Sequence, residues 1–265
     1  MDSKKRGKRL VVVGDIHGQL DGFVKILRHA KLIDAQQNWC GSHVRLLQIG
    51  DVFDRGPHGK QADALLDKLQ HQAAQQTGCE VIRLVGNHEL EMLLSNFAIC
   101  RLPREEAIAL RDKLTKQVLD GELRGAYAYK GYLFTHAGVT NKLYRIFKMQ
   151  LADASAANIA TLINVVFKES ISHQFFKHPI FNISVSRAGP DRFGGIFWED
   201  LTDLVKSYPQ SPFWQVIGHT QVEHIIVDPA SKLIPVDVGM HRKLQYFEMS
   251  ETGETKICTV EENPA

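Results

Sequence analysis

The stretch Leu10–Gly18, with the sequence LVVVGDIHG, decides the fold of this chain. Its four apolar residues predict a short buried strand, and the Gly-Asp pair predicts a sharp turn that puts polar side chains at the strand's carboxyl end. The segments 45–51 (RLLQIGD) and 80–87 (EVIRLVGN) repeat this order. Short strands that alternate with helices predict consecutive βαβ units, whose ligands bind at the carboxyl edge of the sheet.

Helical periodicity follows the first two strands. Apolar residues at helical spacing predict helices from Leu20 to Leu27 and over roughly 60–75. The segment from about Phe97 to Tyr129 is helical and charged in pattern, with Pro103 near a helix start. The segment 151–171 reads as another helix that leads into an irregular loop ending near Gly195. We therefore expect one domain over 1–265, with a basic tail at 1–9 and cap segments at about 97–130 and 140–195.

Further strands are expected in the second half of the chain. Tyr132–Thr135 and Trp214–Ile217 are short apolar runs that end in His136 and in Gly218-His219-Thr220. Four later runs predict antiparallel strands joined by short turns: Ile225–Val227, Leu233–Val236, Gln245–Met249 and Lys256–Val260.

Composition excludes several functional classes. Of the 265 residues 44% are hydrophobic and 23% charged, which is usual for a soluble globular protein. The formal net charge of +2 gives no global field for nucleic acid or a membrane surface, so neither is an expected partner. The four cysteines form no CxxC pair, and no run has the length of a secretory signal or a membrane span. We expect a cytoplasmic protein with reduced cysteines.

Six polar residues that can bind metal ions lie just past the expected strand ends. They are Asp15, His17, Asp51, Asn87, His136 and His219. Any one of these motifs alone is often only a turn, but five motifs in this order point to a site. Carboxylate, imidazole and one amide oxygen, without thiolate, suit divalent first-row ions, with manganese favoured and iron or zinc as alternatives. Six ligands are enough for two ions, which together can promote in-line phosphoryl displacement.

The motifs GDIHG, GDVFDRG, GNHE, THAG and GHT, in this order, resemble the calcineurin-like metallophosphoesterases. Within that superfamily they resemble the phosphoprotein phosphatase branch, which is related to the symmetrical diadenosine tetraphosphate hydrolases. The resemblance implies an α/β fold: a β-sandwich of two mixed sheets flanked by helices, with a dimetal site at the strand ends. It also implies that Asp15, His17 and Asp51 hold the first ion, that Asp51 bridges, and that Asn87, His136 and His219 complete the second.

The same resemblance implies roles for residues beside the ions. Arg55 matches an arginine that binds phosphate oxygens, for which a guanidinium is well shaped. His88 matches the general acid that protonates the leaving oxygen, and Asp54 matches the carboxylate that orients it. Glu89 is interpreted only as a favourable charge at a helix start.

The second phosphate-binding arginine is less clear from the sequence. Arg187 and Arg192, in SRAGPDRFGGIFWED, are both candidates, and Arg187 is preferred. Val222, rather than a second histidine, follows the GHT motif, as in the phosphoprotein phosphatase branch. His224 is then expected to be exposed, and His241 is read as a loop residue rather than a ligand.

These features predict a metal-dependent phosphoric ester hydrolase similar to the serine/threonine protein phosphatases. We expect hydrolysis of phosphomonoesters, above all phosphoserine and phosphothreonine in proteins, by in-line attack of a metal-bridging hydroxide. The expected partners are a phosphorylated protein or a small phosphoester. The alternative is a dinucleoside polyphosphate hydrolase, which the motifs THAG, with Ala137, and GHT favour. A non-enzymatic scaffold is not favoured, because all six ligands and His88 are present.

Overall fold

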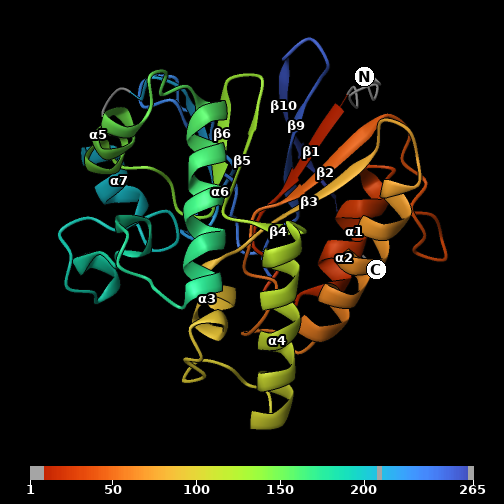
Figure 1. Cartoon of the computed structure of the whole chain (residues 1–265). Helices are drawn as coiled ribbons and strands as arrows, with labels where there is room; N and C mark the ends of the chain where they lie inside the picture. Colours follow the sequence, from red (N-terminus) through yellow and green to blue (C-terminus); the bar gives the residue numbers. More distant parts are fainter. Residues whose placement is uncertain (1–8, 208–210, 262–265) are drawn as a thin grey trace.

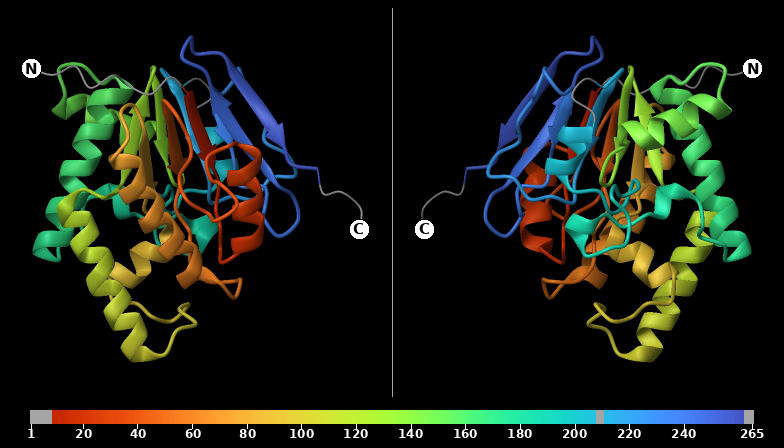
Figure 2. Two further views of the ribbon diagram at one scale, coloured as in Figure 1. Left: turned by 90° about the vertical axis from the view of Figure 1, so that its right-hand side faces the viewer. Right: turned by 90° about the vertical axis from the view of Figure 1, so that its left-hand side faces the viewer.

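The computed structural model describes residues 9–207 and 211–261. The basic tail predicted at 1–9 therefore lies outside the described residues except for Arg9. Two sheets pack face to face, and helices cover their outer faces (Figures 1 and 2). In strand order, the six-stranded sheet contains β10 (Thr255–Thr259), β9 (Gln245–Met249), β1 (Arg9–Val13), β2 (Val44–Gln48), β3 (Glu80–Leu84) and β4 (Leu123–Arg124). The four-stranded sheet contains β5 (Ala126–Tyr129), β6 (Tyr132–Thr135), β7 (Trp214–Ile217) and β8 (Leu233–Pro235).

Both sheets are mixed, as the sequence predicts. Strands β1 to β4 run parallel, whereas β9 is antiparallel to both β1 and β10. In the second sheet β6, β7 and β8 run parallel and β5 is antiparallel to β6. The predicted fold class is confirmed: the parallel strands end at the same side of each sheet, and their carboxyl ends are where α/β proteins place ligands.

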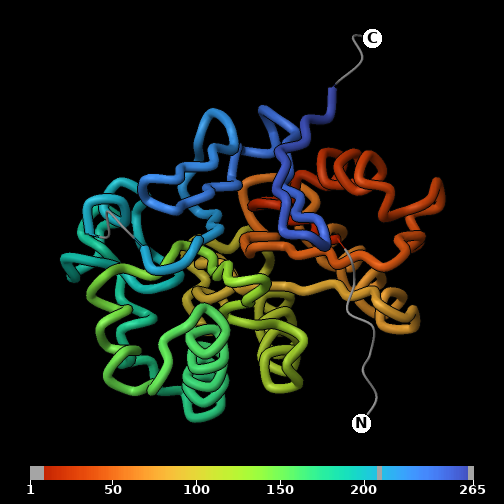
Figure 3. Tube along the Cα trace, turned by 90° about the horizontal axis from the view of Figure 1, so that it is seen from above, coloured from red at the N-terminus to blue at the C-terminus, as the bar shows by residue number. Residues whose placement is uncertain are grey.

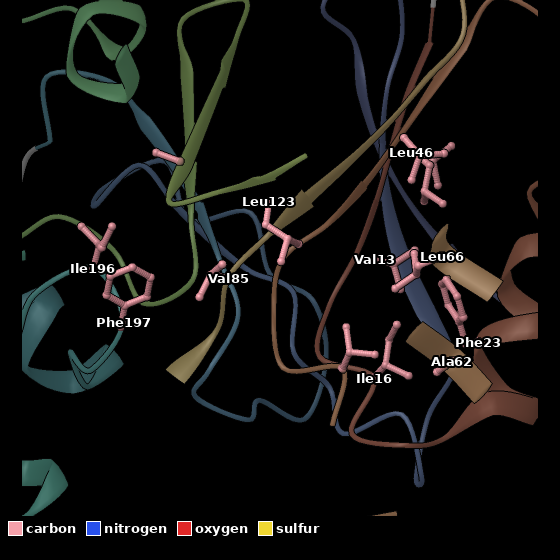
Figure 4. Close-up of a cluster of buried hydrophobic side chains, with 14 of the residues drawn as sticks. Val13, Ile16, Phe23, Leu46, Ala62, Leu66, Val85, Leu123, Ile196 and Phe197 are labelled. Atoms are coloured by element: carbon pink, nitrogen blue, oxygen red, sulfur yellow. The ribbon is translucent and has the colours of Figure 1, made fainter. Parts of the chain in front are cut away.

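The alternation of side chains along β1 explains why two layers pack on it. Val11 and Val13 point to one face and join Phe23 in the cluster formed with the outer helices, whereas Leu10 and Val12 point to the other sheet. Figure 4 shows the outer cluster, with Val13 beside Phe23. Because both faces are buried, the strand reads as a continuous apolar run.

Helices cover the outer faces. Helices α1 (Leu20–His29) and α2 (Gly59–Ala74) pack on the six-stranded sheet, and α6 (Ala156–His173) packs on β5 and β6. The remaining helical elements are α3 (Asn87–Leu93), α4 (Arg104–Asp120), α5 (Asn141–Gln150), α7 (Leu201–Ser207) and the 3₁₀ turns η1 (Pro179–Phe181) and η2 (Val185–Arg187). Seen from above, the first strands and helices lie on one side and the helical segments after residue 100 lie on the other (Figure 3). Among the described residues no helix is both long and apolar enough to cross a membrane.

The structure corrects several sequence-based predictions. Residues 225–227 form no strand, and Ile225 is buried between the sheets without pairing to a neighbouring strand. The prediction failed because an apolar pattern indicates burial but not strand pairing. Strand β8 is parallel to β7, not antiparallel, because the long connection after Ile217 lets the chain return in the same direction.

The two segments that we propose as caps also differ in detail from the sequence-based prediction. Residues 97–103 are not helical, and the helical pattern ends at Asp120, before β4 and β5. Helices α5 and α7 were not predicted, and α6 begins at Ala156 rather than at 151. Asn164 of α6 joins this segment to the sheet, because its side chain accepts from the Gly125 and Ala126 amides at 2.9 and 3.0 Å.

A buried ion cluster fixes β3 between α2 and α4. The Arg83 side chain is only 2% exposed and donates to Asp63 and Asp67 of α2. Lys113 of α4 contacts the same two carboxylates. A buried cation with this many partners is costly to remove, because the carboxylates are left without their charge partner.

We therefore expect Arg83→Met to lower the free energy of unfolding by about 3 kcal/mol. Urea denaturation of the metal-free protein measures this change. The matched control is Lys116→Met, which removes an exposed ion pair with Asp120 and should leave the unfolding midpoint nearly unchanged. Equal midpoints for the two variants would show that the Arg83 cluster does not stabilise the fold.

Candidate active site

The six predicted metal ligands all lie at the carboxyl ends of strands. Asp15 and His17 follow β1, Asp51 follows β2, Asn87 follows β3, and the remaining two histidines follow β6 and β7. All six are at least nine-tenths buried. The fold thus brings together residues from 15 to 219 in the sequence, as predicted.

Backbone crowding explains the glycine before Asn87. A Cβ at Gly86 would lie 2.1 Å from Asp51 Oδ1, so any larger residue would displace this carboxylate. Asp51 itself has a φ of +57°, and His17 and His219 also lie in the left-handed region. Aspartate and histidine tolerate that region better than most residues, but each still stores strain.

One group of ligands gathers around Asn87. Asn87 Oδ1 lies 2.8 Å from His219 Nδ1 and 3.0 Å from His136 Nε2. Asp51 Oδ2 lies 3.6 Å from the same His136 nitrogen. Ligands about 2.1 Å from a shared ion stand roughly 3.0 to 3.4 Å from one another. Asp51, His136 and His219 accordingly form one of the two groups with the spacing of a metal site among the described residues.

The other group gathers around His17. His17 Nε2 lies 3.4 Å from Asp51 Oδ2 and 3.9 Å from Asp15 Oδ2. The compact cluster here consists of His17, Asp51 and His88, and Asp15 stands outside it. Both Asp15 oxygens instead accept from the His219 amide at 3.2 Å. The structure thus places Asp15 beside the predicted first ion site but less tightly than the other ligands.

The histidines are prepared to bind metal through one ring nitrogen. His17 Nδ1 lies 2.9 Å from the Phe53 carbonyl and His136 Nδ1 lies 3.0 Å from the Ile49 carbonyl. Since a carbonyl only accepts, Nδ1 carries the proton and Nε2 offers a lone pair. Burial lowers the pKa of His17 to about 4 and also lowers the pKa values of His136 and His219, so these rings are neutral near pH 7.

An unpartnered atom tests whether these residues fit metal ions. His17 Nε2, the ring nitrogen that faces Asp51 and Asp15, is buried and has no hydrogen-bond partner among the described residues. Buried polar atoms are rarely left unpaired, and each such atom costs about 1 to 3 kcal/mol. Neutral imidazoles beside buried carboxylates are the donor set of divalent first-row ions, so the residues fit two such ions.

His88 is paired with Asp54 as predicted. His88 Nδ1 lies 2.7 Å from Asp54 Oδ2, and the His88 amide donates to Asp51 Oδ1 at 2.9 Å. Burial alone would lower the pKa of His88, but the hydrogen bond to Asp54 and the charge of Asp51 outweigh it, and the pKa is raised. An imidazole held and charged in this way can donate a proton from Nε2.

The arginines differ in how they are placed. Arg55 lines a cavity of about 290 Å³ together with Asp15 and His17. Arg187 donates to Thr220, the residue after His219, at 2.5 Å and pairs with Asp200 at 3.0 Å. Its Nε is buried without a partner among the described residues.

Arg192, the alternative to Arg187, is exposed. Its guanidinium lies 5.2 Å from the ring centre of Phe193. The packing around His219 therefore favours Arg187. The two other histidines named above are exposed: His224 contacts Lys243, and His241 lines the outer part of the cavity.

Sequence reasoning missed the part that Glu89 plays. Its carboxylate is 2% exposed and accepts from three backbone amides: Asp51 at 2.8 Å, Val52 at 2.9 Å and Gly86 at 2.9 Å. Only the third of these belongs to its own helix start. The signal in the sequence is a glutamate three residues after Gly86, the capping-box position, which gives no hint of the other two contacts.

Asp237 was also missed. It follows β8, is 1% exposed, and lines the same cavity as Asp15 and His17. Burial and then the charge of Asp237 raise the pKa of Asp15. A weaker signal was available, because the segment 233–239 (LIPVDVG) is an apolar run followed by an aspartate, although no glycine precedes it.

Comparisons with known proteins bear on the family and the fold. Residues 8–224 match the model of the calcineurin-like phosphoesterase family. Over 88 residues the chain is 44% identical to Shewanella-like protein phosphatase 1 of Plasmodium berghei; this segment is 33% of the chain and 24% of the relative. The match thus spans about a quarter of that relative's length.

Two solved structures share the fold at low identity. A cold-active protein-tyrosine phosphatase of a psychrophilic Shewanella species has a TM-score of 0.61 at 18% identity, covering 96% of this chain and 80% of that one. A putative diadenosine tetraphosphatase has a TM-score of 0.53 at 15% identity, covering 98% and 96%.

The Glu89 contacts lead to a local test. Glu89→Gln replaces one acceptor oxygen by a donor, so at least one buried amide loses its partner. We expect the free energy of unfolding to fall by about 1.5 to 3 kcal/mol and exchange at the Asp51, Val52 or Gly86 amides to speed up at least tenfold. Hydrogen exchange of the metal-free protein measures this.

Glu199→Gln is the matched control. Glu199 is also buried and accepts from the Gly194 and Asp200 amides at 3.0 and 2.9 Å. Its variant should speed exchange at those two amides instead. Unchanged exchange at Asp51 and Val52 in the Glu89 variant would contradict the role assigned to Glu89.

Proposed function

The chain belongs to the calcineurin-like phosphoesterase family, and we propose that it is a dimetal phosphatase that hydrolyses phosphomonoesters, with phosphoserine and phosphothreonine in proteins as substrates. One observation carries the proposal. The complete set of six ligand residues and the His88–Asp54 pair meet at one edge of the sandwich, all of them buried.

In this proposal Asp15, His17 and Asp51 hold the first ion, and Asp51, Asn87, His136 and His219 hold the second. The close spacing of the second set and the unpartnered nitrogen of His17 support the assignment. Two divalent ions there would supply a nucleophilic water near neutral pH and offset the charge of the phosphate. Manganese suits the nitrogen and oxygen donor set, with iron or zinc as alternatives.

The chain's own residues would bind the phosphate and move one proton. Arg55 and Arg187 would hold phosphate oxygens from two sides, since a guanidinium forms paired hydrogen bonds to them. His88 would donate its Nε2 proton to the departing oxygen while Asp54 keeps the ring oriented and charged. The short contact between His88 and Asp54 supports this division of roles.

A protein substrate is supported by the relatives. The Plasmodium relative is named a protein phosphatase and the Shewanella structure a protein-tyrosine phosphatase. The putative diadenosine tetraphosphatase keeps the dinucleoside polyphosphate hydrolase as the second candidate. In a phosphopeptide the attacked phosphorus is terminal, whereas in a dinucleoside polyphosphate it lies within the phosphate chain, so the two candidates differ in both the attacked and the leaving group.

A substrate panel on the manganese-loaded protein tests the proposal. It contains phosphoserine, phosphothreonine and phosphotyrosine peptides, p-nitrophenyl phosphate, a diadenosine polyphosphate and a phosphodiester. We expect the highest kcat/KM on a phosphoserine or phosphothreonine peptide. A higher kcat/KM on phosphotyrosine or on the dinucleotide would make that compound the preferred substrate class instead. Failure to hydrolyse any member of the panel would favour a non-enzymatic scaffold.

The arginine assignment gives a matched set of variants. Arg55→Ala and Arg187→Ala should each lower kcat/KM on a phosphopeptide by about 100-fold, because each removes a charged donor to the reacting phosphate. Arg192→Ala should stay within about twofold, since that side chain lies on Phe193. Steady-state kinetics measures these changes. A large loss of kcat/KM in the Arg192 variant with none in the Arg187 variant would assign the phosphate-binding role to Arg192 instead.

The proton donor is tested by the leaving group. His88→Asn should lower kcat on a phosphoserine peptide by roughly 10³- to 10⁴-fold, because its alkoxide leaves poorly without a proton. The loss on p-nitrophenyl phosphate, whose phenolate leaves readily, should be much smaller. The control is His224→Asn at an exposed histidine, which should change neither rate.

The outcome that counts against His88 as the acid is an equal loss on the two substrates while both ions stay bound. Metal content of each variant is measured alongside, so that a lost ion is not mistaken for a lost proton donor. Asp54→Asn should show the same dependence on the leaving group more weakly, because it acts on the substrate only through His88.

A further inference from the structure

Asp237 is a buried carboxylate that the six-ligand scheme does not use. It follows β8, whose carboxyl end lies at the same edge as the ends of β1 and β7. The chain at this point touches the Asp15 turn, because a Cβ at Gly14 would lie 2.4 Å from the Val236 carbonyl oxygen and 3.2 Å from Asp237 Cα. Asp237 is thus fixed beside the turn that carries Asp15 and His17.

The two oxygens of Asp237 have different surroundings. Oδ1 accepts from the Gly239 amide at 2.8 Å and so holds its own turn. Oδ2 is buried and has no hydrogen-bond partner among the described residues. The turn therefore accounts for one oxygen only, and an unpartnered carboxylate oxygen in the interior is costly unless something positive faces it.

The residues around the cavity beside Asp237 show which charges lie near it. Asp237 lines it together with Asp15, His17 and Arg55, and Asp51 adjoins through its contact with His17. Asp237 belongs to neither of the two compact groups of possible ligands described above. Asp15 and Asp237 line the cavity and Asp51 adjoins it, while the nearby cations are Arg55 and Arg242, whose guanidinium lies beside Gly239. Three carboxylates beside two guanidinium groups leave a local excess of negative charge.

We propose that Asp237 is a further residue of the first ion site, where its Oδ2 supplies negative charge that holds the divalent ion beside Asp15 and His17. The proposal rests on the metal binding in the proposed function and adds a seventh residue to it. Asp237 is a positioning residue in this role, since it acts on the ion rather than on substrate. Residues of this kind typically change metal affinity by about 10- to 100-fold.

The variant Asp237→Asn distinguishes the role of Oδ1 in the turn from the proposed role of Oδ2. The asparagine keeps an oxygen for the Gly239 amide, so the turn is retained, but it loses the charge and the free lone pairs. Titration of the metal-free variant with MnCl₂ by calorimetry should show one of two ions bound about 10- to 100-fold more weakly than in the wild type. Urea denaturation of the metal-free variant should show a midpoint equal to or higher than the wild type, because one of three mutually repelling charges is gone.

Two results of these measurements would overturn the proposal. Manganese affinity within about twofold of the wild type would exclude it. A weaker affinity together with a lower unfolding midpoint in the metal-free protein would assign the effect to the turn. If the asparagine variant does not fold, Asp237→Ser keeps an oxygen for Gly239 without the charge, and the same two measurements on it decide.

The control variant is Asp228→Asn. Asp228 lies before the opposite end of β8 and accepts from Ser231 and from the Ala230 amide in a turn. It should leave the affinity for both ions unchanged. A wild-type protein that binds no manganese would refute the proposed function itself, whereas normal binding by both the wild type and the Asp237 variant would refute only this inference.

A double-variant comparison identifies the ion concerned. If Asp237 acts on the first ion, Asp237→Asn should add little to Asp15→Asn, which already weakens that ion. It should add its full effect to Asn87→Ala, which weakens the other ion. The reverse pattern would place Asp237 at the second ion and overturn the assignment.

Discussion

Asp51 adopts a left-handed backbone conformation with its carboxylate in the space where residue 86 would carry a Cβ. Such a conformation costs of order 1 to 3 kcal/mol and persists only where the surroundings enforce it. Glu89 supplies that enforcement by accepting from the Asp51 and Val52 amides. The rest of the site depends on this arrangement, because both groups of ligands include Asp51.

The ligand-bearing turns were predictable because each carries its signal locally. An apolar run followed by a glycine and a polar residue predicts a buried strand and places the polar side chain at its end. This pattern occurs at Asp15, Asp51 and Asn87. At Asp237 the apolar run leads directly into the aspartate without a glycine, and no resemblance supported a role for it. The contacts of Glu89 could not be predicted, since two of its three amide partners come from a different turn of the chain.

The elements that were mispredicted share a physical cause. The burial of Ile225 and the direction of β8 are set by packing between the sheets, which apolar alternation does not encode. The cap segments were harder still. Helix α4 was expected, but its position depends on burial of Leu114 and Val118 in the core and on ion pairs such as that of Lys113 with Asp63, which are contacts between distant parts of the sequence.

The two sides of the site differ in the charge of the side chains that line them. Around Asn87 the ligands are mostly neutral imidazoles, which bind a cation through lone pairs and leave its charge available to the substrate. Around His17 buried carboxylates dominate, and Asp237 adds another. An ion held by more carboxylates is bound more firmly but has less positive charge left for an anion. In the proposed assignment the first ion would therefore anchor the site and the second would attract the phosphate, with Arg187 donating to Thr220, next to His219, on that same side.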